Sequence, residues 1–253
     1  MSQAYGKEFA RVYNKMWGSF SIKASSYIMK FYEHKDINKS NRNLLDICCG
    51  TGQLALEFLK NGYQVTGLDL SPHMISYARE NTREYETKGA VNFIEADASN
   101  FELKKEYGLA VSIYDSINHL NDIKDLGSCF KSVYQCVVKN GYFIFDLSTS
   151  KGLNKWNGMH IEDKENIFFM IKGIFDTDRN NAVTRVSGFI KEEDDLYSRF
   201  EEIVYNYVYQ LDEVKKILEE TGWNHVHFSI IKDLDKNIEE PETEDRIFVV
   251  AQK

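Results

Sequence analysis

Three aspartates and a pair of glycines are the residues of this sequence best suited to bind a small molecule. Gly50 and Gly52 lie between an apolar segment and a helical one, and a turn without β-carbons lets the backbone approach a ligand closely. Asp46 precedes this turn, Asp69 ends the next apolar segment, and Asp97 ends a third one. A carboxylate placed like Asp69 can accept hydrogen bonds from both hydroxyls of a ribose. Asp97 can accept the exocyclic amine of adenine, so the pattern predicts a site for an adenosine-containing molecule.

Each of these features also has a simpler explanation. A glycine turn is an ordinary joint between a strand and a helix, and an aspartate after a strand is often a helix N-cap. Three acids at successive strand ends are harder to explain in this way, because the carboxyl ends of parallel strands meet at one edge of a sheet. An NAD(P) or flavin dinucleotide enzyme is an alternative, since Gly50, Gly52 and Ala55 satisfy the loose G-x-G-x-x-G/A pattern. Asp46 argues against it, because a carboxylate there repels a diphosphate but suits an ammonium group.

Alternating strand and helix patterns between residues 44 and 150 must position these side chains. The predicted strands cover residues 44–48, 63–70, 91–97, 109–115 and 142–148. Strands that alternate with helices indicate an α/β fold with a parallel sheet and helices on both faces. A predicted helix at 211–221 and a hairpin of residues 225–234 and 246–253 return the chain to this sheet.

Residues 151–209 have a different pattern. Apolar segments at 167–175, 182–190 and 200–209, with a turn-rich segment at 176–181, predict an inserted antiparallel sheet. We therefore expect a main unit of residues 1–150 and 210–253, with a helical lid in residues 1–40. The insertion is expected to cover the substrate.

The composition excludes several classes of function. A net charge of −8, with dispersed Lys and Arg residues, gives no attraction to a nucleic acid. No apolar run approaches the length of a membrane span and the first residues lack the apolar core of a signal peptide, so we expect a cytoplasmic protein without membrane contact. The four cysteines match neither a disulfide framework nor a zinc site, and His225 and His227 are read as surface residues, so no metal is predicted. The oligomeric state is not predicted.

Five segments, in order, resemble the motifs of the class I S-adenosylmethionine-dependent methyltransferases. They are LLDICCGTGQLA (44–55), VTGLDLSPHMISYAR (65–79), FIEADASNF (93–101), YGLAVSIYDSINHL (107–120) and NGYFIFDLST (140–149). The resemblance implies a seven-stranded, mostly parallel sheet of order 3-2-1-4-5-7-6 whose seventh strand is antiparallel.

The same resemblance implies a role for individual residues. The cofactor would be S-adenosyl-L-methionine, with S-adenosyl-L-homocysteine as product. Its methionine part would lie near Asp46, Cys48 and Gly50, with Gly52 in the same turn. Its ribose would be bound at Asp69, with Leu70 beside it, and its adenine at Asp97 and Ala98. Cys48 replaces the first glycine that is usual in this motif.

Three shorter segments are similar to small-molecule N-methyltransferases, particularly those that dimethylate amino sugars. They are FARVYNKMW (9–17), the CGTG turn (49–52) and SINHL (116–120). This narrower resemblance places Tyr13 and Trp17 over the methionine part as a lid, and residues 114–119 beside the methyl acceptor. It implies a small-molecule acceptor that is methylated at nitrogen.

Methyl transfer is an in-line displacement that mainly requires a nucleophile held close to the methyl carbon with water excluded. Tyr13, Trp17 and Tyr114 can contribute because a sulfonium is attracted to aromatic faces, although each can equally be a packing residue. His119 follows the fourth strand and can accept a proton from an amine, so His119 and Tyr13 are the catalytic candidates. A module that binds the cofactor without catalysis is the alternative from another functional class.

Overall fold

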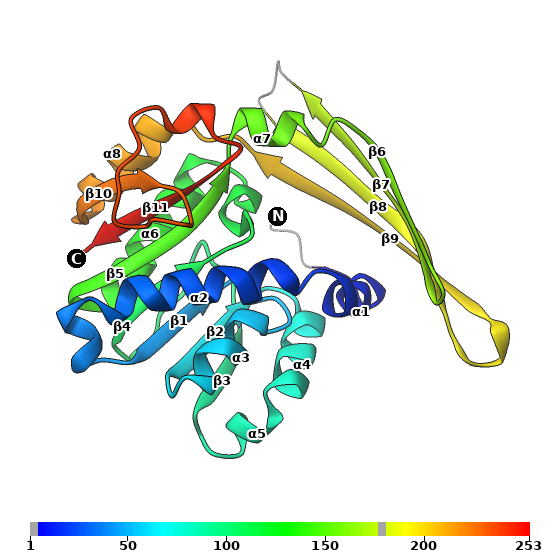
Figure 1. The fold of residues 1–253 in the computed structure, drawn as a ribbon, viewed down its shortest axis with the longest axis horizontal. Coiled ribbons are helices and arrows are strands. Elements are labelled where there is room, and N and C mark those ends of the chain that lie inside the picture. The colour runs from blue at the N-terminus through cyan, green and yellow to red at the C-terminus, as the bar shows by residue number, and fades with distance from the viewer. Residues whose placement is uncertain (1–4, 177–180) are drawn as a thin grey trace.

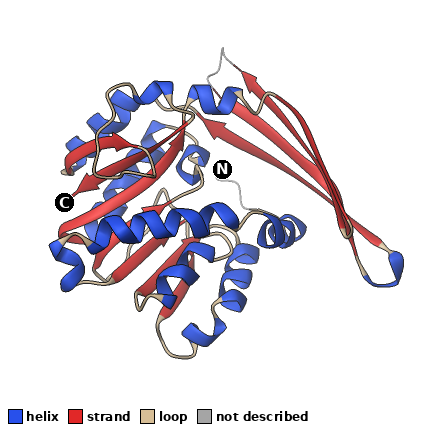
Figure 2. Ribbon diagram, viewed as in Figure 1, coloured by secondary structure: helices blue, strands red, loops and turns tan. Residues whose placement is uncertain are grey.

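The computed structural model describes residues 5–176 and 181–253, which fold around two β-sheets (Figures 1 and 2). A seven-stranded sheet forms the centre of the main body, and a four-stranded antiparallel sheet projects from this body. Residues 177–180 of the predicted turn-rich segment and the first four residues of the predicted lid lie outside the described residues.

The seven-stranded sheet has the order β10-β11-β5-β4-β1-β2-β3. Its strands are β1 (Asn43–Ile47), β2 (Gln64–Asp69), β3 (Val91–Glu95), β4 (Tyr107–Ser112), β5 (Val137–Ser148), β10 (Asn224–Ser229) and β11 (Arg246–Gln252). Strand β11 is antiparallel to both of its neighbours, which confirms the predicted order with an antiparallel seventh strand. The winding reverses between β1 and β4, and ligands bind beyond the carboxyl ends of strands at such a point.

Helices cover both faces of this sheet. One layer consists of α2 (Ser19–Glu33), α3 (Gln53–Lys60) and α4 (Pro72–Asn81), followed by the short α5 (Arg83–Glu86). The other consists of α6 (Ile123–Cys136) and α8 (Leu211–Thr221). Successive residues of a strand point to opposite faces, so the neighbours Leu44 and Leu45 enter the two different cores. In the described parts of the chain, no helix is both long enough and apolar enough to cross a bilayer.

The inserted sheet is an antiparallel meander that follows the short helix α7 (Ser150–Asn154). Its strands are β6 (Gly158–Lys164), β7 (Ile167–Asp176), β8 (Asn181–Lys191) and β9 (Tyr197–Tyr207). The sequence pattern predicts no strand before residue 167, whereas β6 pairs along the edge of β7. Most side chains of β6 are exposed, so this strand lacks the half-buried alternation that identifies the others.

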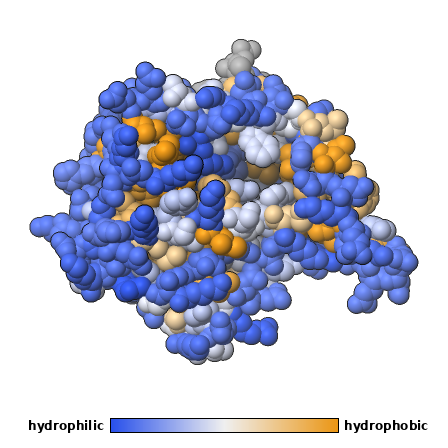
Figure 3. Space-filling model, in the orientation of Figure 1, coloured by the Kyte–Doolittle hydropathy of each residue, from blue (hydrophilic) through white to orange (hydrophobic). Residues whose placement is uncertain are grey.

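One face of the inserted sheet packs onto helix α1 (Lys7–Met16). Phe169, Val186 and Phe200 share a buried core with Phe9 and Val12 of this helix. The opposite face carries Phe168 and Phe189, which are 40% and 43% exposed. Figure 3 shows hydrophobic side chains gathered over the inserted sheet and a hollow between it and the main body. The inserted sheet and α1 therefore form a wall that stands beyond the carboxyl ends of the main strands (Figure 1).

Candidate active site

A cavity of about 490 Å³ lies between the carboxyl ends of the main strands, helix α1 and the inner face of the inserted sheet. The predicted site residues that line it are Tyr13, Cys48, Gly50, Asp69, Leu70, Asp97, Ala98, Tyr114 and His119. These residues come from separate strand ends, the first helix and the loop after β4. The fold therefore brings most of the predicted site together in one place.

Asp69 ends β2 and holds two backbone segments at the cavity wall. Its Oδ2 accepts the N–H of Gly50 at 2.9 Å, and its Oδ1 accepts the N–H of Ser71 at 2.9 Å. Burial raises the pKa of this carboxyl, and the backbone hydrogen bonds from Ser71 and Gly50 act in the opposite direction. Leu70 also donates its backbone N–H to this carboxylate, which has about four acceptor positions and so keeps capacity for a further donor. Asp69 can therefore fix the glycine turn and bind hydroxyl groups of a ligand at the same time.

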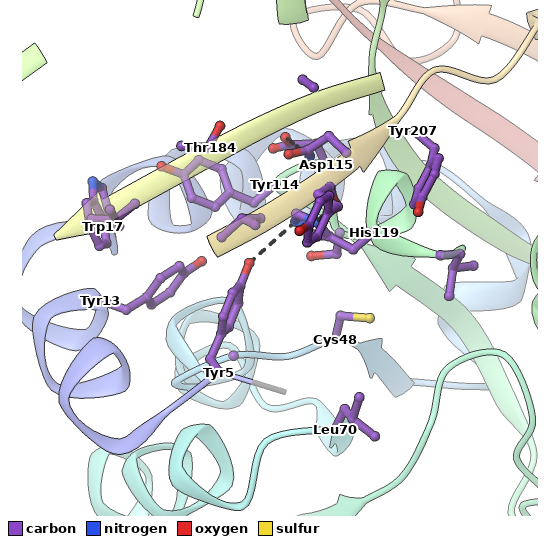
Figure 4. A pocket seen from close by; sticks show the side chains of 18 of the residues that line it. Tyr5, Tyr13, Trp17, Cys48, Leu70, Tyr114, Asp115, His119, Thr184 and Tyr207 are labelled. Carbon is purple, nitrogen blue, oxygen red and sulfur yellow. Dashed lines mark hydrogen bonds between the residues drawn. The ribbon is translucent and has the colours of Figure 1, made fainter. Parts of the chain in front are cut away.

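The glycine turn and the loop after β3 complete this side of the cavity. Gly50 has a φ of +54°, and a β-carbon there would lie 3.6 Å from the ring of Tyr13. Asp97 faces the cavity beyond β3, where its Oδ1 accepts the N–H of Ser99 at 2.9 Å and its hydroxyl at 2.7 Å. The side chain of Cys48 also lies at the cavity (Figure 4). A ligand in this part of the cavity would touch backbone, two acids and a thiol.

Two of the predicted residues, Asp46 and Gly52, do not line the cavity. Asp46 is buried, and its carboxyl accepts the backbone N–H of Ala55, while its Oδ2 has no hydrogen-bond partner among the described residues. Burial, and then the neighbouring charge of Asp69, raise the pKa of Asp46 well above its ordinary value. Gly52 has a φ of +78° and begins α3, where a β-carbon would lie 3.0 Å from that of Ala78. Ligand contact by either residue stays a prediction.

The four cysteines are free thiols. Burial raises the pKa of both Cys48 and Cys49 well above the ordinary value of a thiol, which keeps these two neighbours protonated at neutral pH. His225 and His227 lie on β10. In residues 5–176 and 181–253, no group of His, Cys, Asp and Glu side chains has the arrangement of a metal site.

Aromatic side chains from the N-terminal segment cover the glycine turn. The ring of Tyr13 lies edge-on to Tyr114, with 6.2 Å between the ring centres, and 5.8 Å from the ring of Trp17. Trp17 in turn meets Phe169 of the inserted sheet edge-on at 5.4 Å. Tyr5, which the sequence pattern did not single out, also faces the cavity (Figure 4). Helix α1 thus joins the glycine turn to the inserted sheet through rings.

His119 ends the 3₁₀-helix Ser116–His119, and its two ring nitrogens have different partners. Its Nδ1 lies 2.8 Å from the carbonyl oxygen of Tyr205 on β9. A carbonyl only accepts, so Nδ1 carries the proton and Nε2 has a free lone pair. Nε2 faces the cavity, where the hydroxyl of Tyr5 lies 3.4 Å away and can donate to it (Figure 4). The histidine is therefore held in the tautomer that can accept a proton.

A cluster of charged and polar residues at the same cavity contains pairings that the sequence pattern did not indicate. It consists of Asp115 after β4, Arg246 on β11 and Asn206 on β9, which line the cavity, and Asp146 on β5, which is buried behind them. Arg246 forms ion pairs with Asp115 and Asp146, and Asn206 donates to Asp115. We call these four residues the Asp115 cluster. The partners Asp115 and Arg246 are 131 positions apart, so no local motif could indicate their pairing.

Comparisons with known proteins agree with this architecture. Residues 44–141 match the family described as a methyltransferase domain. A protein of Geobacillus sp. (strain WCH70), provisionally named a methyltransferase, is 24% identical over 98% of this chain and 99% of its own length.

Two solved structures have the same fold over almost the whole chain. One is an S-adenosylmethionine-dependent methyltransferase from Clostridium acetobutylicum, with a TM-score of 0.80, 23% identity and 97% of each chain covered. The other is a sugar N-methyltransferase from Streptoalloteichus sp., with a TM-score of 0.75, 17% identity and coverage of 100% of this chain and 95% of its own. The methyltransferase domain matched at residues 44–141, the strand order and the shared fold support a class I S-adenosylmethionine-dependent methyltransferase.

Proposed function

We propose that the protein transfers the methyl group of S-adenosylmethionine to an amine nitrogen of a small molecule. One observation carries the proposal: Nε2 of His119, an acceptor whose partner is the Tyr5 hydroxyl, faces the same cavity as the glycine turn, Asp69 and Asp97. A proton acceptor and a nucleoside-type site thus share one space of about 490 Å³, which is the size of a small-molecule pocket. The fold shared with a sugar N-methyltransferase supports nitrogen as the acceptor atom.

The cofactor would occupy the side of the cavity that faces the glycine turn. Asp69 offers two carboxylate oxygens for the ribose hydroxyls, with Leu70 beside it, and Asp97 with Ala98 would hold the adenine. Cys48 and Gly50 would border the methionine part, and Tyr13 would cover it. The residues fit this ligand because Gly50 leaves backbone space below the ring of Tyr13 and both acids face the cavity. When bound, the cofactor supplies a methyl group on a positively charged sulfur.

His119 would prepare the acceptor for attack. An amine is protonated at neutral pH and has no lone pair to attack with until it loses a proton. Nε2 of His119 takes this proton, and the resulting imidazolium keeps its Nδ1–H bond to the Tyr205 carbonyl. With the cofactor bound, the nitrogen lone pair would form the new bond to the methyl carbon, and the electron pair of the broken carbon–sulfur bond would stay on sulfur.

The inserted sheet would keep water out of this step. Its inner face presents Val186 and Val204, which are buried, to the cavity, and Ile171 lies beside them. Apolar walls lower the local dielectric and keep competing water away from the methyl group. Tyr205 on the same sheet holds His119, so the cover and the proton acceptor belong to one structural unit.

Thermal shift measurements and transfer of a labelled methyl group test the proposal. S-adenosylmethionine and S-adenosylhomocysteine should raise the melting temperature, whereas NADH should not. With a panel of small amines, His119→Ala should lower kcat/KM by about 10²-fold, the lower end of the usual contribution of a general base. The Kd for S-adenosylhomocysteine should stay unchanged in this variant.

His160→Ala is the matched control, because His160 lies on β6 with its side chain 60% exposed and paired with Glu162. This variant should keep the wild-type rate. Stabilisation by NADH but by neither S-adenosyl compound would contradict the cofactor site. An unchanged rate in His119→Ala would remove His119 as the proton acceptor.

A further inference from the structure

The Asp115 cluster forms a compact ionic wall on the acceptor side of the cavity. A nitrogen of Arg246 lies 2.8 Å from Oδ1 of Asp115, and the other terminal nitrogen binds Asp146. Asp146 also accepts the backbone N–H of Asp115 at 3.1 Å, and Asn206 donates to Oδ2 of Asp115 at 3.1 Å. Strands β5, β9 and β11 therefore hold the Asp115 carboxylate in one place.

The wall carries an excess of negative charge. Two carboxylates face one guanidinium, so Asp115, Asp146 and Arg246 together have a net charge of −1 when all are ionised. The positive charge of Arg246 is more than neutralised by its two carboxylate partners, and its guanidinium lies over the rings of Phe20 at 5.0 Å and Tyr114 at 5.7 Å, so it gives a further anion little net attraction. Any anionic group here would meet an acid and no unpaired cation.

The rest of the cavity has the same electrostatic character. Arg246 is the one Lys or Arg residue among the described cavity residues, while Asp69, Asp97 and Asp115 all face the space. Nδ1 of His119, the remaining basic side chain, is already bonded to the carbonyl of Tyr205. Asp69 and Asp97 are allotted to the cofactor in the proposed function, which leaves Asp115 for the acceptor. Each carboxylate oxygen of Asp115 accepts one hydrogen bond, from Asn206 or Arg246, and keeps a lone pair for another donor.

The backbone also orients Asp115. Tyr114 and Asp115 are consecutive residues with φ values of +69° and +49°, a conformation that is costly for residues other than glycine and that persists where surrounding contacts enforce it. The side chain of Asp115 is held by Arg246 of the last strand and Asn206 of the inserted sheet, and its backbone N–H by Asp146 of β5. Strain of this kind at a cavity wall is typical of a binding position.

We propose that the methyl acceptor is a free cationic amine that carries no phosphate or other anionic group, and that Asp115 binds its ammonium group beside His119. The inference rests on the proposed function and specifies its substrate class. A phosphorylated or nucleotide-linked amine would bring negative charge into a cavity whose acids repel it. A free amine is attracted by the same acids, which also offset its repulsion from the positively charged cofactor.

Matched pairs of amines with and without phosphate test this proposal with the wild-type protein. The panel is ethanolamine with phosphoethanolamine, and glucosamine with glucosamine 6-phosphate and UDP-glucosamine. We expect transfer of labelled methyl to a free amine, with kcat/KM at least about tenfold higher than for its phosphorylated counterpart. Equal or faster transfer to a phosphorylated or nucleotide-linked member would overturn the proposal, and so would the absence of transfer to every member.

Thermal shift by S-adenosylhomocysteine is measured in the same samples. It distinguishes failure of the proposed substrate class from failure of the proposed function. A bound cofactor combined with transfer to UDP-glucosamine would leave amine methylation standing and remove only the substrate class. Loss of cofactor binding would contradict the proposed function itself.

The variant Asp115→Asn locates the selectivity. It removes the charge with little change of shape, so KM for the free amine should rise about tenfold and the preference over the phosphorylated partner should shrink. Asp163→Asn is the control, because Asp163 is an exposed acid on the edge strand β6 of the inserted sheet. An unchanged preference in a folded Asp115→Asn protein would contradict the assignment, and the wild-type ratio tests the substrate class even if this variant does not fold.

Discussion

Replacing Asp69 by alanine should separate the observed role of this carboxylate in fixing the glycine turn from its proposed role in binding the cofactor. The change removes the acceptors of the Gly50 and Ser71 N–H groups. Water in the cavity can reach these groups, so we use the lower end of the usual cost, about 1 kcal/mol for each bond. A loss of about 2 kcal/mol lowers the melting temperature of a chain of this length by about 4–8 °C.

The effect on cofactor affinity should be larger. A hydrogen bond to a charged group contributes about 1.5–3 kcal/mol, and the ribose can form two with Asp69. Ribose binding removes water from the carboxylate, and this loss of hydration offsets part of the gain. We therefore expect the Kd for S-adenosylhomocysteine to rise about 10²-fold, which corresponds to about 2.7 kcal/mol.

Isothermal titration calorimetry measures this Kd directly, and urea denaturation measures the free energy of unfolding. Asp212→Ala is a suitable control, since Asp212 is an exposed residue in the first turn of α8. An unchanged Kd in a folded Asp69→Ala protein would refute the role of Asp69 in ribose binding. A lower melting temperature without a change of Kd would restrict Asp69 to fixing the turn.

Two further predictions concern stability. Burial raises the pKa of Asp146 from 3.8 to about 6, so the folded protein binds this proton more tightly than the unfolded chain, and ionisation of Asp146 destabilises the fold increasingly from about pH 4 to pH 6. Urea titrations at pH 4 and pH 7 measure this effect. The free energy of unfolding of Asp146→Asn, taken relative to wild type, should rise by about 3 kcal/mol between these two pH values. The same difference between variant and wild type at both pH values would disprove the shifted pKa. Gly108→Ala should lower the free energy of unfolding by more than about 3 kcal/mol, because the new β-carbon would lie 2.1 Å from the hydroxyl of Tyr32. Gly127 lies within α6, and a β-carbon there would lie 3.4 Å from its nearest neighbour, so Gly127→Ala should be neutral or stabilising. Equal melting temperatures of these two variants would contradict the packing around Gly108.

The parallel sheet and most of the residues that line the cavity near the glycine turn follow from local patterns. Asp69 and Asp97 come directly after strands whose apolar residues mark them as buried, and crossover connections of one hand bring the carboxyl ends of such strands to one edge. The pattern was less informative for β6, which is an exposed edge strand. It was also less informative for Asp46, because a position just before the turn suggests ligand contact, whereas this side chain is buried and accepts the Ala55 N–H. Whether a side chain at a strand end faces the cavity or the core depends on the strand's register, which neighbouring strands decide.

The sequence by itself determined the order of strands and helices, the glycine turn and the acids that follow each strand. These features are encoded by periodicity and by residues a few positions apart. The tertiary structure alone decided the contacts of Asp115 and His119 at the cavity. Arg246 reaches Asp115 because β11 pairs beside β5, with Arg246 opposite Ser148, and Tyr205 reaches His119 because β9 crosses the loop after β4. Such contacts depend on how distant strands pair, and no short stretch of sequence contains that information.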